Sequence, residues 1–280
     1  MCRASTGVDV VSIDRGERLE PAYVLHRRPY RDSSLILDVF TCGGSRIALV
    51  ARGARRASSH WQSILQLFQP VLLSWGGRGE LGTLRRAESI DVPSALRGQG
   101  LLSGLYVNEL LLRLLHRNDP HPGLFGAYQT VLQELTSVPG PVVDGGAAVV
   151  GGVERALRFF ELRLLREIGY GPMLDKEAYT LAPIEAAALY HYVPETGPVL
   201  LPDDSRTMQG RGVPVRGASP QSLDRGELTD RVALRECKRL MREILDVCLG
   251  GRPLNSRRLF RARHTAHAHS TVAAATGNGL

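Results

Sequence analysis

The chain has 280 residues, of which 43% are hydrophobic and 22% are charged, and its formal net charge is +7. These values are typical of a globular protein that is long enough to bury its own core without disulfides or metals. The apolar runs end well before the roughly 20 residues that a membrane span needs, and residues 1–20 are too charged for a signal peptide. The composition therefore excludes fibrous, membrane and secreted proteins, and it predicts a cytoplasmic protein.

Residues 21–92 are predicted to form a small β-barrel. Five short apolar runs rich in Val, Leu and Ile follow one another at residues 22–28, 34–41, 46–52, 66–75 and 80–90. Turn-forming Gly, Pro, Asp and Ser residues separate most of them. Five strands within about 70 residues favour an OB-fold barrel, and an SH3-like barrel is the second choice.

After Pro93 the hydrophobic period changes from two residues to about 3.6, which predicts helices. We expect them at residues 101–117, 120–135, 153–168 and 229–249, with a further short helix at 184–192. The segments 138–152 and 194–220 are rich in Gly and Pro and are predicted to be loops.

The predicted fold class is therefore α+β, with a five-stranded OB-fold barrel followed by an α-helical domain. We expect an N-terminal extension at residues 1–20, the OB-fold domain at 21–92, the helical domain at 93–263 and a disordered tail at 264–280.

Positive charge is concentrated in two segments. Of the 35 basic residues, only Lys176 and Lys238 are lysine. Residues 21–86 carry ten arginines against three acids, and residues 252–280 carry five arginines and no acid. This segregation indicates a surface for a polyanion, because a guanidinium group offers a phosphate a permanent charge and two parallel donors.

The first basic segment supplies the candidate nucleic-acid-binding residues. Tyr30 and Trp61 lie in polar turns and are candidates for stacking on unpaired bases. The arginines expected to contact phosphates are Arg27, Arg28, Arg31, Arg46, Arg52, Arg55, Arg56, Arg78, Arg85 and Arg86. The alternative for each arginine is an ordinary solvated charge.

No catalytic or metal-binding motif is present in the sequence. Residues 77–82 match G-x-G-x-x-G, but they lie between two predicted strands and no helix follows them. The cysteines, Cys2, Cys42, Cys237 and Cys248, lack the spacing of metal ligands. We therefore expect a binding protein that has no cofactor, no metal and no enzymatic activity.

Several strings of the sequence closely resemble the bacterial RecO recombination mediators. They are AYVLHRRPYRDSSLILDVFT (22–41), LVARGARR (49–56), LQLFQPVLLSWGGRGELGTLRRAE (65–88), SGLYVNELLLRLL (103–115), ALRFFELRLLREIGYG (156–171) and GGRPLNSRRLFR (250–261). The resemblance implies binding of single- and double-stranded DNA and annealing of complementary strands. It also implies docking on the acidic tail of the single-stranded-DNA-binding protein SSB, partnership with RecR, and delivery of RecA to coated strands in the nucleoid.

The same resemblance associates Arg158 with SSB docking. Its alternative role is an ion pair with Glu154 or Glu161 on the same helix. The opposite wall of the SSB pocket is expected from Leu124, Phe125 and Tyr128.

Many members of this family carry a four-cysteine zinc module after the GYGP turn. Residues 173–202 contain no cysteine, so the chain resembles the zinc-free branch. Two other classes remain open, an RNA-binding OB-fold protein and a protein-only adaptor whose basic patch meets an acidic partner.

Overall fold

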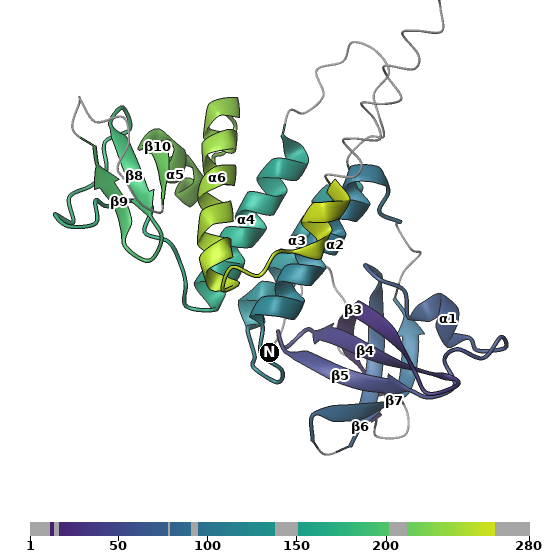
Figure 1. The fold of residues 1–280 in the computed structure, drawn as a ribbon. Helices are drawn as coiled ribbons and strands as arrows, with labels where there is room; N and C mark the ends of the chain where they lie inside the picture. Colours follow the sequence, from purple (N-terminus) through teal and green to yellow (C-terminus); the bar gives the residue numbers. More distant parts are fainter. Residues whose placement is uncertain are drawn as a thin grey trace, which may run out of the picture.

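The structure, a computed structural model, describes residues 12–13, 17–77, 79–90, 95–137, 151–201 and 212–260. A closed β-barrel lies at one end, helices pack against it, and a small sheet lies beyond the helices (Figure 1). The barrel is preceded by a short antiparallel pair, β1 (Ser12–Ile13) and β2 (Glu17–Arg18). The predicted α+β class, with a barrel followed by helices, is confirmed.

Five strands close the barrel in the order β3-β4-β5-β7-β6. They are β3 (Glu20–Tyr30), β4 (Ser34–Thr41), β5 (Arg46–Ala51), β6 (Pro70–Gly76) and β7 (Leu81–Ser89), with the one-turn helix α1 (Trp61–Ile64) between β5 and β6. All pairs are antiparallel except β5 and β7. Alternate side chains such as Leu37, Leu49 and Leu73 fill the interior. This is the five-stranded OB-like barrel that the sequence predicts.

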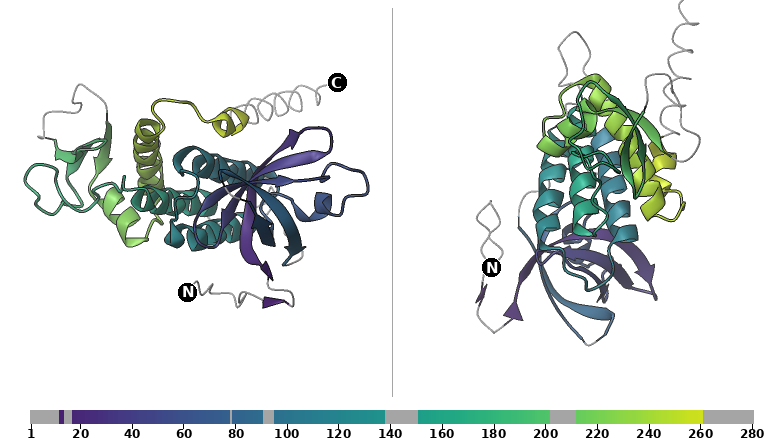
Figure 2. Two further views of the ribbon diagram at one scale, coloured as in Figure 1. Left: turned by 90° about the horizontal axis from the view of Figure 1, so that it is seen from below. Right: turned by 90° about the vertical axis from the view of Figure 1, so that its left-hand side faces the viewer.

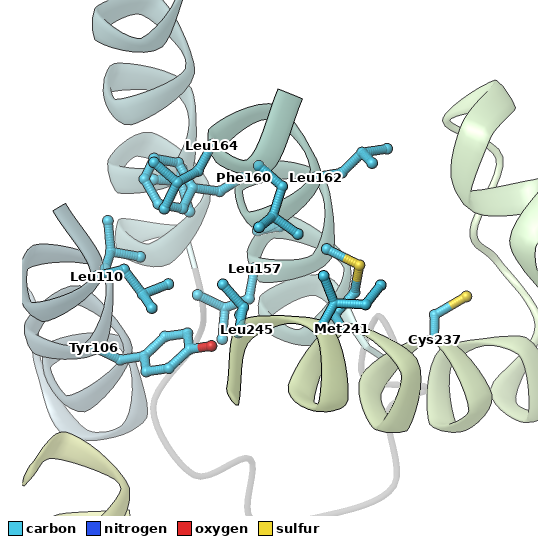
Figure 3. Close-up of a cluster of buried hydrophobic side chains, with 14 of the residues drawn as sticks. Tyr106, Leu110, Leu157, Phe160, Leu162, Leu164, Cys237, Met241 and Leu245 are labelled. Carbon is cyan, nitrogen blue, oxygen red and sulfur yellow. The ribbon is translucent and has the colours of Figure 1, made fainter. Parts of the chain in front are cut away.

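The helical region is built on α2 (Gly98–Leu114), α3 (Pro122–Thr136), α4 (Gly152–Glu167) and α6 (Arg231–Cys248). These are the four long helices that the periodicity predicts. Their apolar faces share one core, in which Tyr106 of α2, Leu157 and Phe160 of α4, and Met241 and Leu245 of α6 converge (Figure 3). A short helix at residues 255–260 ends the described part of the chain.

The segment between α4 and α6 corrects two predictions. In place of a helix at 184–192 and a long loop at 194–220, it contains β8 (Leu189–Val193), β9 (Gly197–Leu200), β10 (Val213–Arg216) and the short helix α5 (Ala218–Arg225). Strand β8 pairs with both β9 and β10. The aromatic residues of β8 favour a strand once partners are available, and those partners come from residues up to 27 positions away. The predicted tail at 264–280 and most of the predicted loop at 138–152 lie outside the described residues.

A cluster of four aromatic rings joins the barrel to the helices. Tyr23 of β3 and Phe40 of β4 lie on the outer face of the barrel, and Phe125 and Tyr128 of α3 pack onto them. The ring centroids are 5.6 Å apart for Tyr23 and Phe125 and 5.1 Å apart for Tyr23 and Tyr128. All four side chains are buried, so the barrel and the helices share one hydrophobic core.

Asn108 of α2 hydrogen-bonds across this junction. The Tyr128 hydroxyl donates to Asn108 Oδ1 at 2.7 Å, and Asn108 Nδ2 donates to the backbone oxygen of Leu25 in β3 at 2.8 Å. Both Asn108 and Tyr128 are buried, so each polar group depends on the other for its partner.

The turn between β4 and β5 makes a second contact with the helices. Gly44 accepts a backbone hydrogen bond from His121, and the backbone oxygen of Arg46 accepts one from Asn118. Gly44 has a φ of +78°, and a Cβ at this position would overlap the backbone of His121. Glycine is therefore required here for both its conformation and its size.

Glu109 of α2 holds the last described helix in place. Its carboxylate accepts hydrogen bonds from the backbone N–H groups of Asn255 (2.9 Å) and Ser256 (2.8 Å) and from the Ser256 hydroxyl (2.7 Å). It thus caps the N-terminus of the helix at 255–260 from a different helix. Burial raises the pKa of Glu109, but the hydrogen bonds from Ser256 and Asn255 and the charge of Arg113 outweigh burial and leave the pKa below its usual value.

We expect Tyr128→Phe to lower the free energy of unfolding by about 1–3 kcal/mol, because it leaves the buried Asn108 Oδ1 without a donor. Urea unfolding measures this change. Tyr179→Phe is the matched control, since the Tyr179 side chain is 74% exposed. Equal stabilities for the two variants would show that the Tyr128–Asn108 hydrogen bond contributes nothing.

We expect Glu109→Gln to increase amide hydrogen exchange across residues 254–260, because an amide accepts fewer of the hydrogen bonds that the carboxylate accepts. In the wild type, the ionised Glu109 carboxylate stabilises the folded chain fully at pH values above the pKa that Glu109 has when unfolded. This stabilisation is lost as pH falls through the lower pKa that Glu109 has in the folded chain. The Gln variant lacks this acid dependence. Glu80→Gln, at an exposed position, serves as the control, and exchange equal to wild type in Glu109→Gln would contradict the capping role.

Candidate nucleic-acid interface and helical-domain pocket

Strand β3 and two loops at one end of the barrel carry six of the predicted arginines; Arg27 and Arg28 lie on β3, and the other four lie in the loops. One loop joins β3 to β4 and the other joins β5 to α1, and both project from the end of the barrel that faces away from the helices (Figures 1 and 2). All six side chains are exposed. We call this set the distal arginine cluster; its members are Arg27, Arg28, Arg31, Arg52, Arg55 and Arg56.

Hydrogen bonds from Arg55 hold the two loops against each other. Its backbone N–H donates to the oxygen of Ser33 at 2.8 Å, and its Nη1 donates to the oxygens of Arg31 at 3.2 Å and Asp32 at 3.3 Å. The positions of the arginines in one loop are thereby linked to those in the other. OB-folds bind oligonucleotides in part with the loop between the first and second strands of the barrel. In this protein those strands are β3 and β4, and the loop between them carries Arg31.

The two candidate stacking residues lie close to this cluster. Tyr30 is half-buried at the end of β3, and the guanidinium carbon of Arg31 lies 5.1 Å from the centre of its ring. Trp61 begins α1 and is half-buried against the barrel core, and its ring contacts His60 edge to face. Both rings therefore combine partial packing with partial exposure.

The structure corrects the prediction for Arg46. Its side chain is only 15% exposed, forms an ion pair with Asp38 at 3.0 Å, and donates to the backbone oxygens of Leu112 (2.6 Å) and Leu115 (3.1 Å). These carbonyls lie at the C-terminal end of α2, where they lack helical partners and attract a cation. Arg46 belongs to the junction between barrel and helices, so we remove it from the interface.

Two further predicted arginines lie on β7, the strand that pairs with β5. Arg85 and Arg86 are exposed on β7, where the pairing with β6 is irregular, and Arg86 pairs with Glu88 at 2.5 Å. The guanidinium group of Arg85 packs over Gly76, where a Cβ would overlap it. Arg78 lies outside the described residues.

The helical region contains a cavity of about 280 Å³ between α2, α4, α6 and the helix at 255–260. Its apolar lining comes from Tyr106, Val153, Leu157 and Phe260. Its cations are Arg158, Lys238, Arg242 and Arg257. An apolar cavity edged by cations suits an acidic ligand that also has a hydrophobic group.

Arg158 both lines this cavity and forms an ion pair. Its Nη2 lies 2.5 Å from Glu161 Oε1, and the Tyr106 hydroxyl donates to the same oxygen at 2.7 Å. Burial and the neighbouring Glu161 carboxylate raise the pKa of Tyr106, so its hydroxyl stays protonated and donates. In the part of the chain that the structure describes, the buried side-chain atoms without a hydrogen-bond partner are Ser103 Oγ, Arg158 Nε and Glu161 Oε2. All three residues line this one cavity, which therefore offers polar groups to a ligand.

The predicted opposite wall of the pocket lies elsewhere. Leu124, Phe125 and Tyr128 are buried, and the last two pack against the barrel as described above. None of them lines the cavity. The sequence does not show that Phe125 and Tyr128 pack against Tyr23 and Phe40 of the barrel.

Sequence reasoning missed most residues that do line the cavity. Lys238, Arg242 and Arg257 come from α6 and the last helix, and Val153 and Phe260 looked like ordinary core residues. The acid-free stretch from residue 252 onward was the one available signal. The convergence of four separate segments is not visible in any of them alone.

Two further observations concern the described ranges only. Within them, no three His, Cys, Asp or Glu side chains gather in a way that could hold a metal ion. None of their helices is both long and apolar enough to cross a membrane.

Comparison with known proteins identifies the family. The model of the recombination protein O N-terminal region matches residues 17–93, and that of the C-terminal region matches residues 97–258. Three similar proteins are named DNA repair protein RecO. That of Nitrosococcus oceani is 46% identical over 242 residues, which are 86% of this chain and 92% of the relative. That of Aromatoleum aromaticum is 40% identical over 242 residues (86% and 94%), and that of Coxiella burnetii is 40% identical over 241 residues (86% and 97%). The chain therefore belongs to the RecO family of DNA repair proteins.

Proposed function

We propose that this protein is a mediator of recombinational repair that binds single- and double-stranded DNA and anneals complementary strands. With RecR, it helps to load RecA onto SSB-coated single strands at the nucleoid. Membership of the RecO family supports a role in DNA repair. The observation that carries DNA binding is the distal arginine cluster, in which two loops and the adjoining part of β3 hold six exposed arginines at one end of an OB-like barrel.

The distal arginine cluster acts by neutralising charge. Each arginine that contacts a phosphate releases condensed counterions, which favours binding at low salt. Tyr30 and Trp61 stack on unpaired bases beside the contacted phosphates. Neutralised backbones repel one another less, so complementary strands approach and pair. Binding alone accomplishes these steps, and no covalent chemistry is required.

The cavity of the helical region is the proposed site for the SSB tail. This tail is acidic and ends in an aromatic residue with a free carboxylate, so its receptor needs an apolar pocket edged by cations. The cavity provides apolar walls from Leu157 and Phe260 and cations from Arg158, Arg242 and Arg257. Glu161 holds the Arg158 guanidinium in position, and the unpartnered Nε of Arg158 offers a further donor.

We expect Arg52→Ala combined with Arg56→Ala to reduce the salt dependence of DNA binding. If six phosphates are neutralised, log K falls with log salt at a slope of about −4 to −5, and losing two contacts makes this slope less negative by about one to two units. This slope is measured by fluorescence anisotropy with a single-stranded oligonucleotide across a salt series.

The matched control removes two charges from the helical region, with Arg163→Ala and Arg225→Ala, and should leave the slope unchanged. An unchanged slope in the Arg52/Arg56 variant would remove these loops from the binding surface. Stronger competition by RNA than by DNA of the same sequence would favour an RNA-binding protein instead.

We expect Arg158→Gln combined with Glu161→Gln to weaken binding of an SSB-tail peptide by about tenfold or more, with single-stranded DNA affinity nearly unchanged. The double change removes the cation without leaving Glu161 as an unpaired buried charge. Arg163→Gln with Glu167→Gln is the matched control, because it removes another Arg–Glu pair from the same helix. Wild-type peptide affinity in a folded Arg158/Glu161 variant would place the SSB site outside the cavity.

A further inference from the structure

Helix α6 exposes a row of positive charges. Its exposed residues are Val232 and five cations, namely Arg231, Arg235, Lys238, Arg239 and Arg242. At 3.6 residues per turn, the five cations fall within a sector of roughly 100° along about 16 Å of helix. We call them the α6 basic stripe. The opposite face is buried in the helical core, so the stripe has a fixed orientation relative to the rest of the molecule.

The α6 basic stripe is unfavourable for the helix that carries it. Arg231, Arg235 and Arg239 follow one another at spacings of four residues, as do Lys238 and Arg242, and like charges at this spacing repel. Arg231 also lies in the first turn, where a cation opposes the helix dipole. Acidic residues at these positions would stabilise α6, so local stability does not account for the stripe.

Exposed arginines on α2 and α4 are neutralised. Arg163 of α4 pairs with Glu167 at 2.6 Å, and Arg166 pairs with Asp224 of α5 at 2.5 Å. Arg113 of α2 likewise pairs with Glu109.

The α6 basic stripe differs from these helices. Lys238 pairs with Glu154 at 2.6 Å, but within the described ranges no acid pairs with the four arginines of the stripe. Of the acids on α6 near the stripe, Glu236 accepts from Ser219 Oγ and Asp246 pairs with Arg257. Glu243, four residues after Arg239, forms no ion pair with it. The stripe therefore presents uncompensated charge to solvent.

We propose that the α6 basic stripe binds the phosphate backbone of a second DNA strand while the distal arginine cluster holds the first. This inference rests on the proposed function and extends it. Helix α6 packs on α4, whereas the barrel packs on α2 and α3, so the two basic surfaces lie on different parts of the molecule (Figure 1). Two separate phosphate-binding surfaces allow one molecule to hold two strands at once.

The position of the stripe relative to the cavity favours a nucleic acid over an acidic peptide. Lys238 and Arg242 reach the cavity, but Arg231, Arg235 and Arg239 lie outside its lining. A peptide with an apolar end would occupy the cavity and its edge. A row of guanidinium groups along about 16 Å of helix instead suits a repeating backbone of phosphates.

The test uses Arg231→Gln, Arg235→Gln and Arg239→Gln together, which leaves Lys238 and Arg242 at the cavity intact. Glutamine keeps a helix propensity close to that of arginine, so α6 is preserved. The matched control, Arg163→Gln with Arg216→Gln and Arg225→Gln, removes three exposed arginines elsewhere in the helical region.

Three measurements are made on the full chain. These are the Kd for one short oligonucleotide, energy transfer between donor- and acceptor-labelled non-complementary strands bound together, and the rate of annealing of complementary strands. We expect the stripe variant to bind one strand within about threefold of wild type, but to lose at least about tenfold in two-strand complex and in annealing rate. The control should match wild type in all three.

Wild-type two-strand binding and annealing in the stripe variant would overturn the inference. Loss of SSB-tail peptide binding with annealing intact would also overturn it, because the stripe would then serve an acidic protein. The barrel variant Arg52→Ala/Arg56→Ala separates this inference from the proposed function. If that variant keeps its single-strand affinity while the stripe variant loses two-strand binding, the barrel site fails and the stripe stands. If wild type binds no DNA at low salt, both fail.

Discussion

The packing of Tyr23 and Phe40 against Phe125 and Tyr128 is the contact on which the rest of the structure depends. These rings cover the outer surface of β3 and β4 around Tyr23 and Phe40, so that part of the barrel is closed to any ligand. The hydrogen bonds of Asn108 to Tyr128 and to the backbone of Leu25 fix how the helices are oriented on the barrel. The end of the barrel that remains free is the one that carries the distal arginine cluster.

Helix α2 contacts the barrel, the cavity and the last described helix. Tyr106 bonds to Glu161 at the cavity, Asn108 bonds to the backbone of β3, and Glu109 caps the helix at 255–260. Successive side chains on a helix point about 100° apart, so three positions within one turn reach three different neighbours. The barrel, the cavity and the last described helix are thus positioned by adjacent residues of one rigid element.

Local pattern was sufficient for the barrel strands and the four long helices, but not for the small sheet or for the tertiary partners of each element. The apolar runs of the barrel and the 3.6-residue period of the helices were correctly interpreted because each depends on neighbours a few positions away. The residues of β8 (Leu189–Val193) were predicted as part of a helix. One partner, β9, follows in a tight hairpin, and the other, β10, pairs with β8 from 21 to 27 positions away. Phe125 was predicted to line the SSB pocket, but it is buried against Phe40 of a distant strand.

The sequence by itself determined the barrel, the four long helices, the basic character of the β3–β4 and β5–α1 loops and the resemblance to the RecO family. Composition, period and charge segregation are properties of contiguous segments, so they can be read without a structure. Tertiary structure alone decided which charges are free. Arg46 begins β5 and Arg52 directly follows it. Arg46 binds carbonyls at the end of α2 that are 66 and 69 residues away in sequence, whereas Arg52 is exposed. Whether an arginine is free to bind a ligand depends on the groups that pack beside it. Contacts between residues this far apart in the sequence form only when the whole chain is folded.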